Sequence, residues 1–409
     1  MISGPSPFPT PLAAPYAVNH HNQNKLASPA SKTPDPATPR EVSMPRYVNY
    51  LADYSGCGHW RILWPEAAIN ARGDGMSQST TAMVTQPQWY TGVKAVKLQR
   101  QASSSQKEFV KFLKEVKKQH DFKIIYEVDD VVFREVIPDY NKFKFAFDND
   151  EVRQNCVDII NMVDEVTVTC DFMKRLYIEK TGQQNITVVP NFVPNGWMGQ
   201  LYNPRKVERA YELNKKKPRI LYTGSGAHYD VDNKVGGKDD LAGIRDFIRK
   251  TVNKYQWVFV GAFPPQLTDL VQQKKIEFYP WQPLLKYPYF ISNLDAQLMV
   301  APLLPNDFNK AKSDIKFIEA CILGIPCLSQ NIETYSTAPE SLRFDTVEEF
   351  EHKIERILRK KNKYNQSIRK LRRIGEQRIL EIDENIGSHL EVLNTPFGSP
   401  ERKFLNKWN

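Results

Sequence analysis

The stretch that decides the fold is DAQLMVAPLLPNDFNKAKSDIKFIEACILGIPCLSQ, residues 295–330. An apolar run at 295–302 is typical of a buried strand, and the polar loop after it leads into a helical pattern that starts near 310–313. The helix ends at Gly324-Ile325-Pro326, and a second apolar run follows. A strand, a helix and a strand in this order predict a βαβ unit of a parallel sheet.

The polar residues of this helix gather at its start instead of along one face. A helix N-terminus carries free N–H groups and partial positive charge, so it attracts anions. Lys312 and Lys316 would add full charges there and Ser313 a hydroxyl, while Glu319, further along, would accept hydrogen bonds from a ribose diol. The pattern predicts a site for a nucleoside diphosphate, and the alternative is an ordinary solvated basic helix end.

The same alternation of strands and helices fills most of the chain. It predicts an α/β protein with two doubly wound Rossmann-like domains, at 46–213 and 214–375, and a cleft between them. A C-terminal helical segment at 376–409 is expected to pack back on the first domain. Residues 1–45 are rich in Pro, Ala and Ser and predict a disordered tail. A transit peptide is the alternative, but the tail is neither Arg-rich nor amphipathic.

Composition limits the classes of function. The chain has 409 residues, 41% of them hydrophobic, and a formal charge of +9, which favours a polyanionic partner or ligand over a neutral one. Its five cysteines form no CxxC pair, so we expect reduced thiols in a cytoplasmic protein. No run of residues is long and apolar enough for a membrane span, and a soluble protein is predicted.

A glycine-containing loop opens the second domain. The sequence ILYTGSGAHYDVD places Gly224, Ser225 and Gly226 directly after a strand, where a chain without side chains can approach a phosphate closely. His228 follows and is a candidate catalytic residue that would assist the leaving phosphate or the sugar. The alternatives are a tight turn and a surface histidine.

A similar loop follows the first strand of the first domain. SGCGHWRILWP contains Gly56, Gly58, His59 and Arg61. By analogy with GT-B glycosyltransferases, whose donor-binding signature the stretch at 307–330 resembles, this loop would line the cleft on the acceptor side. The alternative is a plain turn between a strand and a helix.

Acidic residues end another strand, in IIYEVDDVVF. In GT-A glycosyltransferases an Asp-x-Asp motif holds a divalent metal on the sugar diphosphate. By analogy, Glu127, Asp129 and Asp130 could hold Mg²⁺ or Mn²⁺, because carboxylate oxygens suit such cations. With two Rossmann-like halves present, we favour Asp129 and Asp130 as catalytic residues that orient or deprotonate an acceptor hydroxyl, so a metal is not required. Capping of a helix is the structural alternative.

DFNKAKSDIKFIEACILGIPCLSQ resembles the donor-binding signature of GT-B glycosyltransferases of the glycogen-synthase and sucrose-synthase type. The resemblance implies a nucleotide-sugar donor, with UDP favoured, transfer with retention at the anomeric carbon, and a role for Glu319 in holding the ribose. The family's first glutamate corresponds to Ala311, and Asp307 or Asp314 could replace it. VDEVTVTCDFMKRLY and NITVVPNFVP are similar to the end of the first GT-B domain.

The acceptor is inferred from charge and from a second resemblance. Together, GCGHWRILWP, YEVDD and FNKAKSDIKFIEA look like glycosyltransferases of tailed phages, some of which modify hydroxymethylated pyrimidines such as hydroxymethylcytosine in double-stranded DNA. That resemblance implies DNA as a partner and the host cytoplasm as the location. Basic residues expected to contact the DNA backbone are Lys94, Lys97, Arg100, Lys111, Lys114 and Lys118. The alternatives are a glycosyltransferase for lipid-linked or surface polysaccharide at the membrane face and a non-catalytic DNA-binding protein.

Overall fold

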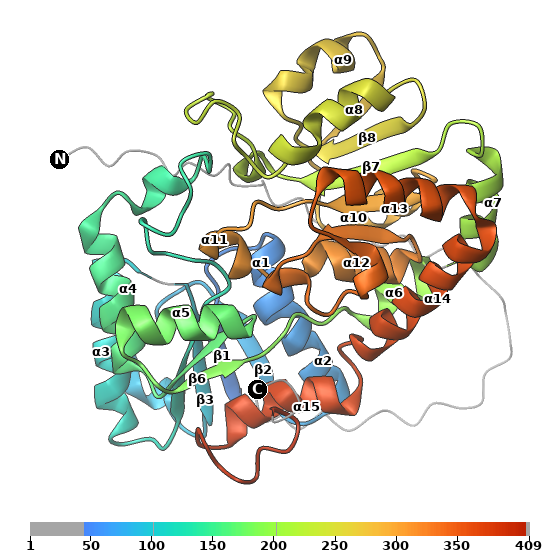
Figure 1. The fold of residues 1–409 in the computed structure, drawn as a ribbon. Coiled ribbons are helices and arrows are strands. Elements are labelled where there is room, and N and C mark those ends of the chain that lie inside the picture. The colour runs from blue at the N-terminus through green and yellow to red at the C-terminus, as the bar shows by residue number, and fades with distance from the viewer. Residues whose placement is uncertain (1–44, 101, 202, 406–409) are drawn as a thin grey trace, which may run out of the picture. The chain divides into compact units, whose positions relative to one another are not determined.

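The computed structural model describes residues 45–100, 102–201 and 203–405. Almost all of the predicted tail, 1–45, therefore lies outside the described residues. Figure 1 shows the two sheets with the helices around them.

The first sheet has six parallel strands in the order β2-β1-β3-β4-β5-β6. Its order reverses between β1 and β3, and in open α/β sheets ligands bind at such a switch point, outside the carboxyl ends of the strands. The strands are β1 (Tyr47–Tyr50), β2 (Ser77–Thr80), β3 (Ala95–Gln99), β4 (Lys123–Glu127), β5 (Glu165–Val168) and β6 (Ile186–Val188).

The helices of this half follow the strands in sequence. In the longest of them, Ser104–Lys117, the side chains of Phe109, Leu113 and Val116 are buried in the hydrophobic core of this half. The helices are α1 (Gly56–Gly58), the π-helical turn η1 (His59–Leu63), α2 (Trp64–Arg72), α3 (Ser104–Lys117), the 3₁₀ turn η3 (Lys144–Phe147), α4 (Asp150–Met162) and α5 (Asp171–Thr181).

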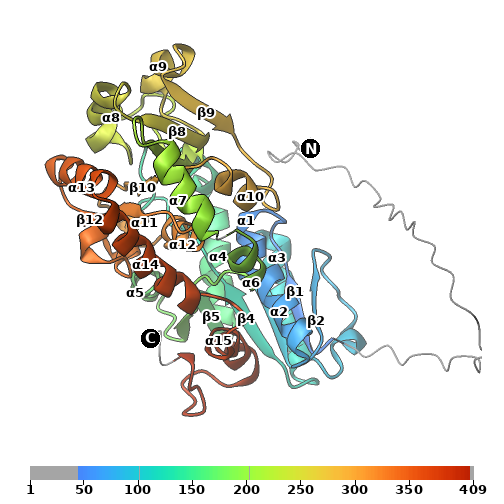
Figure 2. The same ribbon diagram turned by 90° about the vertical axis from the view of Figure 1, so that its right-hand side faces the viewer.

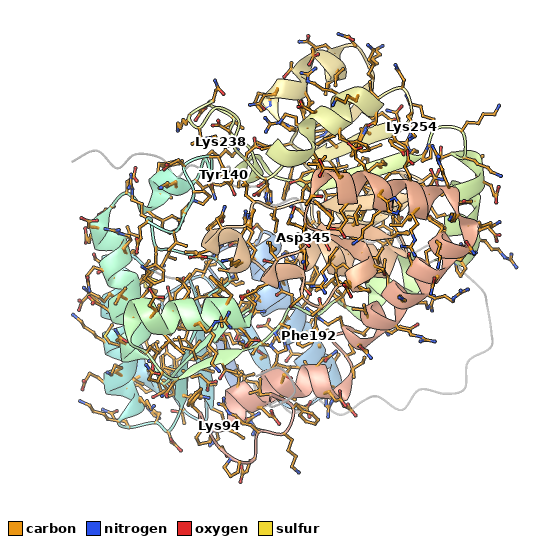
Figure 3. The ribbon with its side chains drawn as sticks, in the orientation of Figure 1. Lys94, Tyr140, Phe192, Lys238, Lys254 and Asp345 are labelled. Atoms are coloured by element: carbon orange, nitrogen blue, oxygen red, sulfur yellow. The ribbon has the colours of Figure 1, made fainter. Side chains whose placement is uncertain are left out.

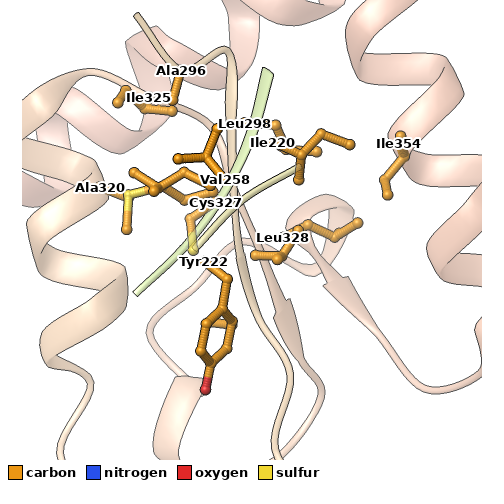
Figure 4. Close-up of a cluster of buried hydrophobic side chains, with 14 of the residues drawn as sticks. Ile220, Tyr222, Val258, Ala296, Leu298, Ala320, Ile325, Cys327, Leu328 and Ile354 are labelled. Atoms are coloured by element: carbon orange, nitrogen blue, oxygen red, sulfur yellow. The ribbon is translucent and has the colours of Figure 1, made fainter. Parts of the chain in front are cut away.

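The second sheet is also parallel, in the order β12-β11-β10-β7-β8-β9. Its switch point lies between β7 and β10, which are the strands that precede the glycine loop and the stretch at 295–330. Figure 4 shows the apolar cluster on these strands, with Ile220, Val258 and Leu298 among its members. The strands are β7 (Arg219–Gly224), β8 (Gln256–Gly261), β9 (Ile276–Pro280), β10 (Leu298–Ala301), β11 (Cys327–Gln330) and β12 (Arg343–Phe344).

Helices of the second half surround this sheet, and the chain then returns to the first domain. The helix α15 contacts α2, and its residues Ile386 and Leu393 join a cluster with Tyr47 of β1. Figure 2 shows α14 and α15 in succession along this return path. The helices are α6 (Asn195–Leu201), α7 (Pro204–Leu213), α8 (Arg245–Thr251), α9 (Thr268–Gln272), α10 (Tyr287–Ser292), α11 (Asp307–Lys310), α12 (Ile315–Leu323), α13 (Val347–Arg359), α14 (Lys361–Gln377) and α15 (Asp383–Asn394).

The two domains are joined by apolar packing and a backbone bridge as well as by the chain that connects them. Phe308 and Ala311, from the connection between β10 and α12, are buried in the hydrophobic core of the first domain. The returning chain forms a parallel bridge between Val193 and Ile379. The two domains are therefore held together by apolar packing, and the two chain segments that cross between them by backbone pairing.

Candidate nucleotide-sugar site

The site forms where β7 ends, at the switch point of the second sheet. Gly224, Ser225 and Gly226 follow the strand, and a 3₁₀ turn at Gly226–His228 brings His228 back over it. The Ser225 Oγ accepts a hydrogen bond from the Ala227 N–H and holds this turn. A side chain at position 224 would meet the ring and hydroxyl of Tyr222 at 2.8–2.9 Å, so this position requires glycine.

Two lysines converge on the His228 ring. The Lys316 Nζ, in the first turn of α12, lies 3.1 Å from His228 Nε2 and 3.4 Å from the Tyr222 hydroxyl. The Lys312 Nζ lies 3.4 Å from His228 Nδ1. The predicted donor residues Lys312, Lys316 and His228 are thus brought together beside the glycine loop.

A buried carboxylate orients the histidine. The Asp240 Oδ2 lies 2.6 Å from His228 Nδ1, so this nitrogen carries the proton and donates it, and Nε2 is left to accept from Lys316. Burial raises the pKa of Asp240, but the hydrogen bond from His228 and the charge of Lys312 outweigh it and lower the pKa overall. Burial and the two lysine charges lower the pKa of His228 to about 3. The ring is therefore neutral at physiological pH.

The charges of Lys312 and Lys316 suit the binding of an anion. Burial and the nearby charge of Lys312 lower the pKa of Lys316 to about 7, and burial also lowers the pKa of Lys312. When both lysines are charged, their two ammonium groups on one neutral ring exceed the charge of the one buried carboxylate behind it. A diphosphate placed between these groups and the glycine loop would compensate that excess positive charge.

Glu319 lies one turn beyond Lys316 on α12. Its Oε2 accepts a hydrogen bond of 2.8 Å from the Tyr287 hydroxyl of α10, and burial raises its pKa to about 7. Among the described residues, no protein group donates a hydrogen bond to the other oxygen, Oε1. A carboxylate with an unused oxygen at this depth fits the predicted contact with a ribose diol.

The helix itself differs from the prediction at its start. We expected one helix from 310–313, but α11 ends at Lys310 and α12 begins at Ile315. The break exists because Ala311 is drawn into the core of the first domain. The Asp314 carboxylate, at the N-cap position of α12, binds Arg378 and Thr337. An anion would therefore bind at the lysines and not at the free end of the helix.

Asp307 and Asp314, the two candidates to replace the family's first glutamate, each have an ion-pair partner. Asp314 is engaged by Arg378, and Asp307 pairs with Lys310 at 3.0 Å on an exposed part of α11. Ser313 lines a cavity of about 260 Å³ between the domains, together with Lys312, Cys170 and Thr337. The replacement of that glutamate by Asp307 or Asp314 stays a prediction, as does the role of Ser313.

In the first domain, the loop after β1 is a tight turn into a helix. The Asp53 Oδ1 accepts hydrogen bonds from the Ser55 and Gly58 N–H groups. A side chain at position 58 would lie 1.9 Å from the Asp53 carbonyl oxygen, whereas position 56 is open. The His59 Nδ1 bonds to the Ser55 carbonyl. Gly56, Gly58 and His59 thus follow a strand at the switch point of the first sheet, and their role in the cleft stays a prediction.

Arg61 was wrongly predicted to line the cleft. Its side chain is 1% exposed and pairs with Glu127 at 2.7 Å, a residue that is equally buried. It also donates to the Val189 carbonyl and to Asn191. Arg61 therefore ties β4 to the end of β6, and Glu127 is not free to bind a metal.

Asp129 and Asp130 follow β4 at the same edge of the sheet. Asp129 Oδ1 lies 3.3 Å from the Nε of Arg100, which also pairs with Asp53. Asp130 is exposed, but the surrounding protein atoms and the charge of Asp129 raise its pKa, while Lys312 acts in the opposite direction. The charges of Asp130 and Lys312 act on each other, which links this carboxylate to the donor site.

The lysines expected to bind DNA are dispersed. The strand β3, AVKLQ, was not predicted from the sequence, and all five of its residues are buried. Lys97 in this strand is only 4% exposed, and burial lowers its pKa to about 8. Lys97 is therefore wrongly predicted, and Arg100 is occupied by the two aspartates. The remaining candidates, Lys94, Lys111, Lys114 and Lys118, are exposed.

These four lysines do not border the site. Lys94 precedes β3 and so lies at the amino edge of the sheet, and Figure 3 shows it at the opposite end of the first domain from Tyr140. The helix α3 starts near the carboxyl edge and runs back over 14 residues, which is about 20 Å. Lys111 and Lys118 also pair with Glu108 and Glu115 on the same helix. A single basic track into the site is absent from this face.

Sequence reasoning missed several residues of the site. Asp240 lies 12 positions from the histidine it orients, and Asn309 and Tyr140 bind the other oxygen of the same carboxylate. Tyr222 was hidden within a strand. Only Asp240 had a local signal, as one of two consecutive acids after a glycine-containing loop.

Neither a metal site nor a membrane-spanning helix is found among the described residues. Among residues 45–100, 102–201 and 203–405, no group of three or more His, Cys, Asp and Glu side chains is arranged to hold a metal ion. Within the same residues, no helix is both long and apolar enough to cross a membrane.

Comparison with known proteins places the fold. No family model and no curated protein matches the chain. Solved structures of HepE from Anabaena match it at 10–11% identity. The complex with UDP and glucose has a TM-score of 0.57 and covers 86% of this chain and 100% of its own. The complex with UDP-glucose has a TM-score of 0.55 and covers 85% and 98%. The chain has the GT-B fold, with two parallel six-stranded sheets.

Proposed function

We propose that the protein is a glycosyltransferase that moves a sugar from a UDP-sugar to a hydroxyl acceptor. The observation that carries this proposal is the convergence of Lys312 and Lys316 on neutral His228, beside Gly224–Gly226 and one turn from Glu319. The HepE structures, which share the fold, hold UDP and UDP-glucose.

In the proposed reaction, the bond between the anomeric carbon and the β-phosphate oxygen breaks, and the acceptor oxygen bonds to that carbon. The lysines stabilise the negative charge that develops on the leaving diphosphate, because preorganised cations act strongly in a partly buried site. Retention, which the sequence resemblance implies, is achieved if the acceptor attacks from the side of the leaving group, and its proton then passes to the leaving phosphate. Asp130 would take it instead if the configuration inverts. Proton NMR of the product anomer distinguishes the two routes.

Hydroxymethylated pyrimidine in DNA is the acceptor we propose. Support comes from the net charge of +9 and from a cavity of about 140 Å³ between α13 and α14. Four cationic side chains line that cavity: Lys353, Arg356, Lys363 and Lys370. A basic cavity of this kind fits a phosphate group of a polyanion.

The test supplies duplex DNA with hydroxymethylcytosine or hydroxymethyluracil and a panel of UDP- and GDP-sugars, and measures nucleoside masses after digestion. A hexose- or pentose-sized gain on one base supports the whole proposal. UDP-sugar hydrolysis without any gain on DNA would replace the DNA acceptor by a saccharide or lipid-linked one. Absence of nucleotide-sugar binding would overturn the proposed function.

A further inference from the structure

The segment between β4 and α4, residues 128–149, extends from the first domain to the donor site of the second. The Tyr140 hydroxyl donates to Asp240 Oδ1 at 2.8 Å and accepts from Asn309 Nδ2 at 3.0 Å. Tyr140 is buried, and Asn309 also donates to the same Asp240 oxygen at 2.6 Å. The segment is thus fastened to the carboxylate that orients His228.

Two residues beyond this anchor, Lys142 lies over the glycine loop. A Cβ at position 226 would be 3.0 Å from the Lys142 Nζ and 3.2–3.5 Å from its Cε and Cδ, so the whole end of the side chain follows the Gly226 backbone. No carboxylate within the described ranges lies in ion-pair distance of Lys142. The Lys142 Nζ lies over the ring of Phe143, 5.0 Å from the ring centroid. An ammonium group without a counterion is therefore held on the loop where a diphosphate would bind.

We propose that Lys142 contacts the diphosphate of the nucleotide sugar and that Tyr140 is a positioning residue that holds Lys142 there. This inference rests on the proposed function. Lys142 would be a third lysine at the diphosphate, supplied by the first domain, whereas Lys312 and Lys316 come from the connection and helix of the second. Binding of the donor then links the two domains through one ion contact, and the buried Tyr140 hydroxyl fixes where that contact forms.

The direct test compares the affinities of UDP and uridine, by calorimetry and competition, for the wild type and Lys142→Ala. A lost charge-assisted hydrogen bond weakens UDP binding by about tenfold or more and leaves uridine binding unchanged. Lys144→Ala is the matched control, because Lys144 lies on the same segment but pairs with Asp139. It should retain wild-type affinity for UDP, as Lys142→Arg should for the most part.

The outcomes separate the two proposals. If the wild type binds UDP and Lys142→Ala binds it equally well, or if uridine affinity falls in parallel, the role of Lys142 is wrong while the proposed function stands. If the wild type binds no UDP, the proposed function itself fails.

A double-mutant cycle tests the anchor. Tyr140→Phe removes the hydroxyl that meets Asp240 while keeping the ring. It should weaken UDP binding in the wild-type background and weaken it clearly less when residue 142 is already alanine, because both changes act on one contact. Additive losses would overturn the role of Tyr140 as the positioning residue for Lys142.

Discussion

Binding of UDP above neutral pH should draw a proton from solution onto Lys316. The pKa of this lysine is about 7 in the free protein, because its ammonium is buried and lies near Lys312. At pH 8 about one-tenth of the Lys316 side chains are therefore charged. An anionic diphosphate beside Lys316 restores the charge and requires about 0.9 proton, whereas Glu319, with a pKa of about 7, can release only about 0.1. The expected net uptake is about 0.8 proton per UDP.

Calorimetry at pH 8 in two buffers with different ionisation enthalpies measures this uptake. Lys316→Gln should abolish it and weaken UDP binding by about tenfold or more. Lys310→Gln is the control, because Lys310 pairs with Asp307 and lies outside the cluster around His228. UDP binding without proton uptake in the wild type, or uptake that persists in Lys316→Gln, would refute the reasoning.

The same shift acts on folding. Because the pKa of Lys316 is lower in the folded chain than in the unfolded one, the unfolded chain binds more protons between about pH 7 and 10.5. This group's contribution to the free energy of unfolding therefore rises with pH across that window. Denaturant unfolding at pH 7 and pH 9 should show a smaller rise in Lys316→Gln than in the wild type, and an equal rise would contradict the lowered pKa.

Three further substitutions, the first of them paired with a control, test the architecture of the site. Gly58→Ala should destabilise the fold by about 2–3 kcal/mol, since its Cβ would overlap the Asp53 carbonyl, whereas Gly56→Ala should be tolerated, as denaturant unfolding will show. Arg61→Met should lower the free energy of unfolding by about 3–5 kcal/mol, because it leaves Glu127 buried and unpaired. A loss of UDP affinity in the folded variant would contradict the conclusion that Arg61 lies away from the cleft. Glu319→Gln should remove the preference for UDP over 2′-deoxy-UDP, and a preference that survives would exclude Glu319 as the ribose contact.

Local patterns predicted the second domain well, because its strands are mostly apolar runs, of which β7, β8 and β9 end in Gly or Pro and β10 is followed by Pro302. The first domain was harder to read. The strand β3 carries Lys97 in a buried position, so AVKLQ looked like part of a basic surface, and the error placed Lys97 and Arg100 on DNA. In the structure the charge of Lys97 lies near that of Glu127 in the core.

Some residues of the site could be predicted from the sequence, and others could not. Lys312, Lys316, Glu319 and the glycine loop follow strand ends in the sequence, so their proximity follows from the topology of a parallel sheet. Contacts between distant segments have no such local signal. Tyr140 and Asp240 are separated by 100 positions, and Lys142 reaches Gly226 only because the domains are packed together. Likewise, the helix break at Ala311 arises from packing in the other domain's core.

The most direct test of the central claim is an experimental structure of the protein with a UDP-sugar bound. The account predicts the diphosphate within hydrogen-bonding distance of the Lys312 and Lys316 Nζ atoms, above Gly224–Gly226, and the ribose hydroxyls on Glu319. A UDP-sugar bound elsewhere, with Lys312 and Lys316 still on the His228 ring, would contradict it.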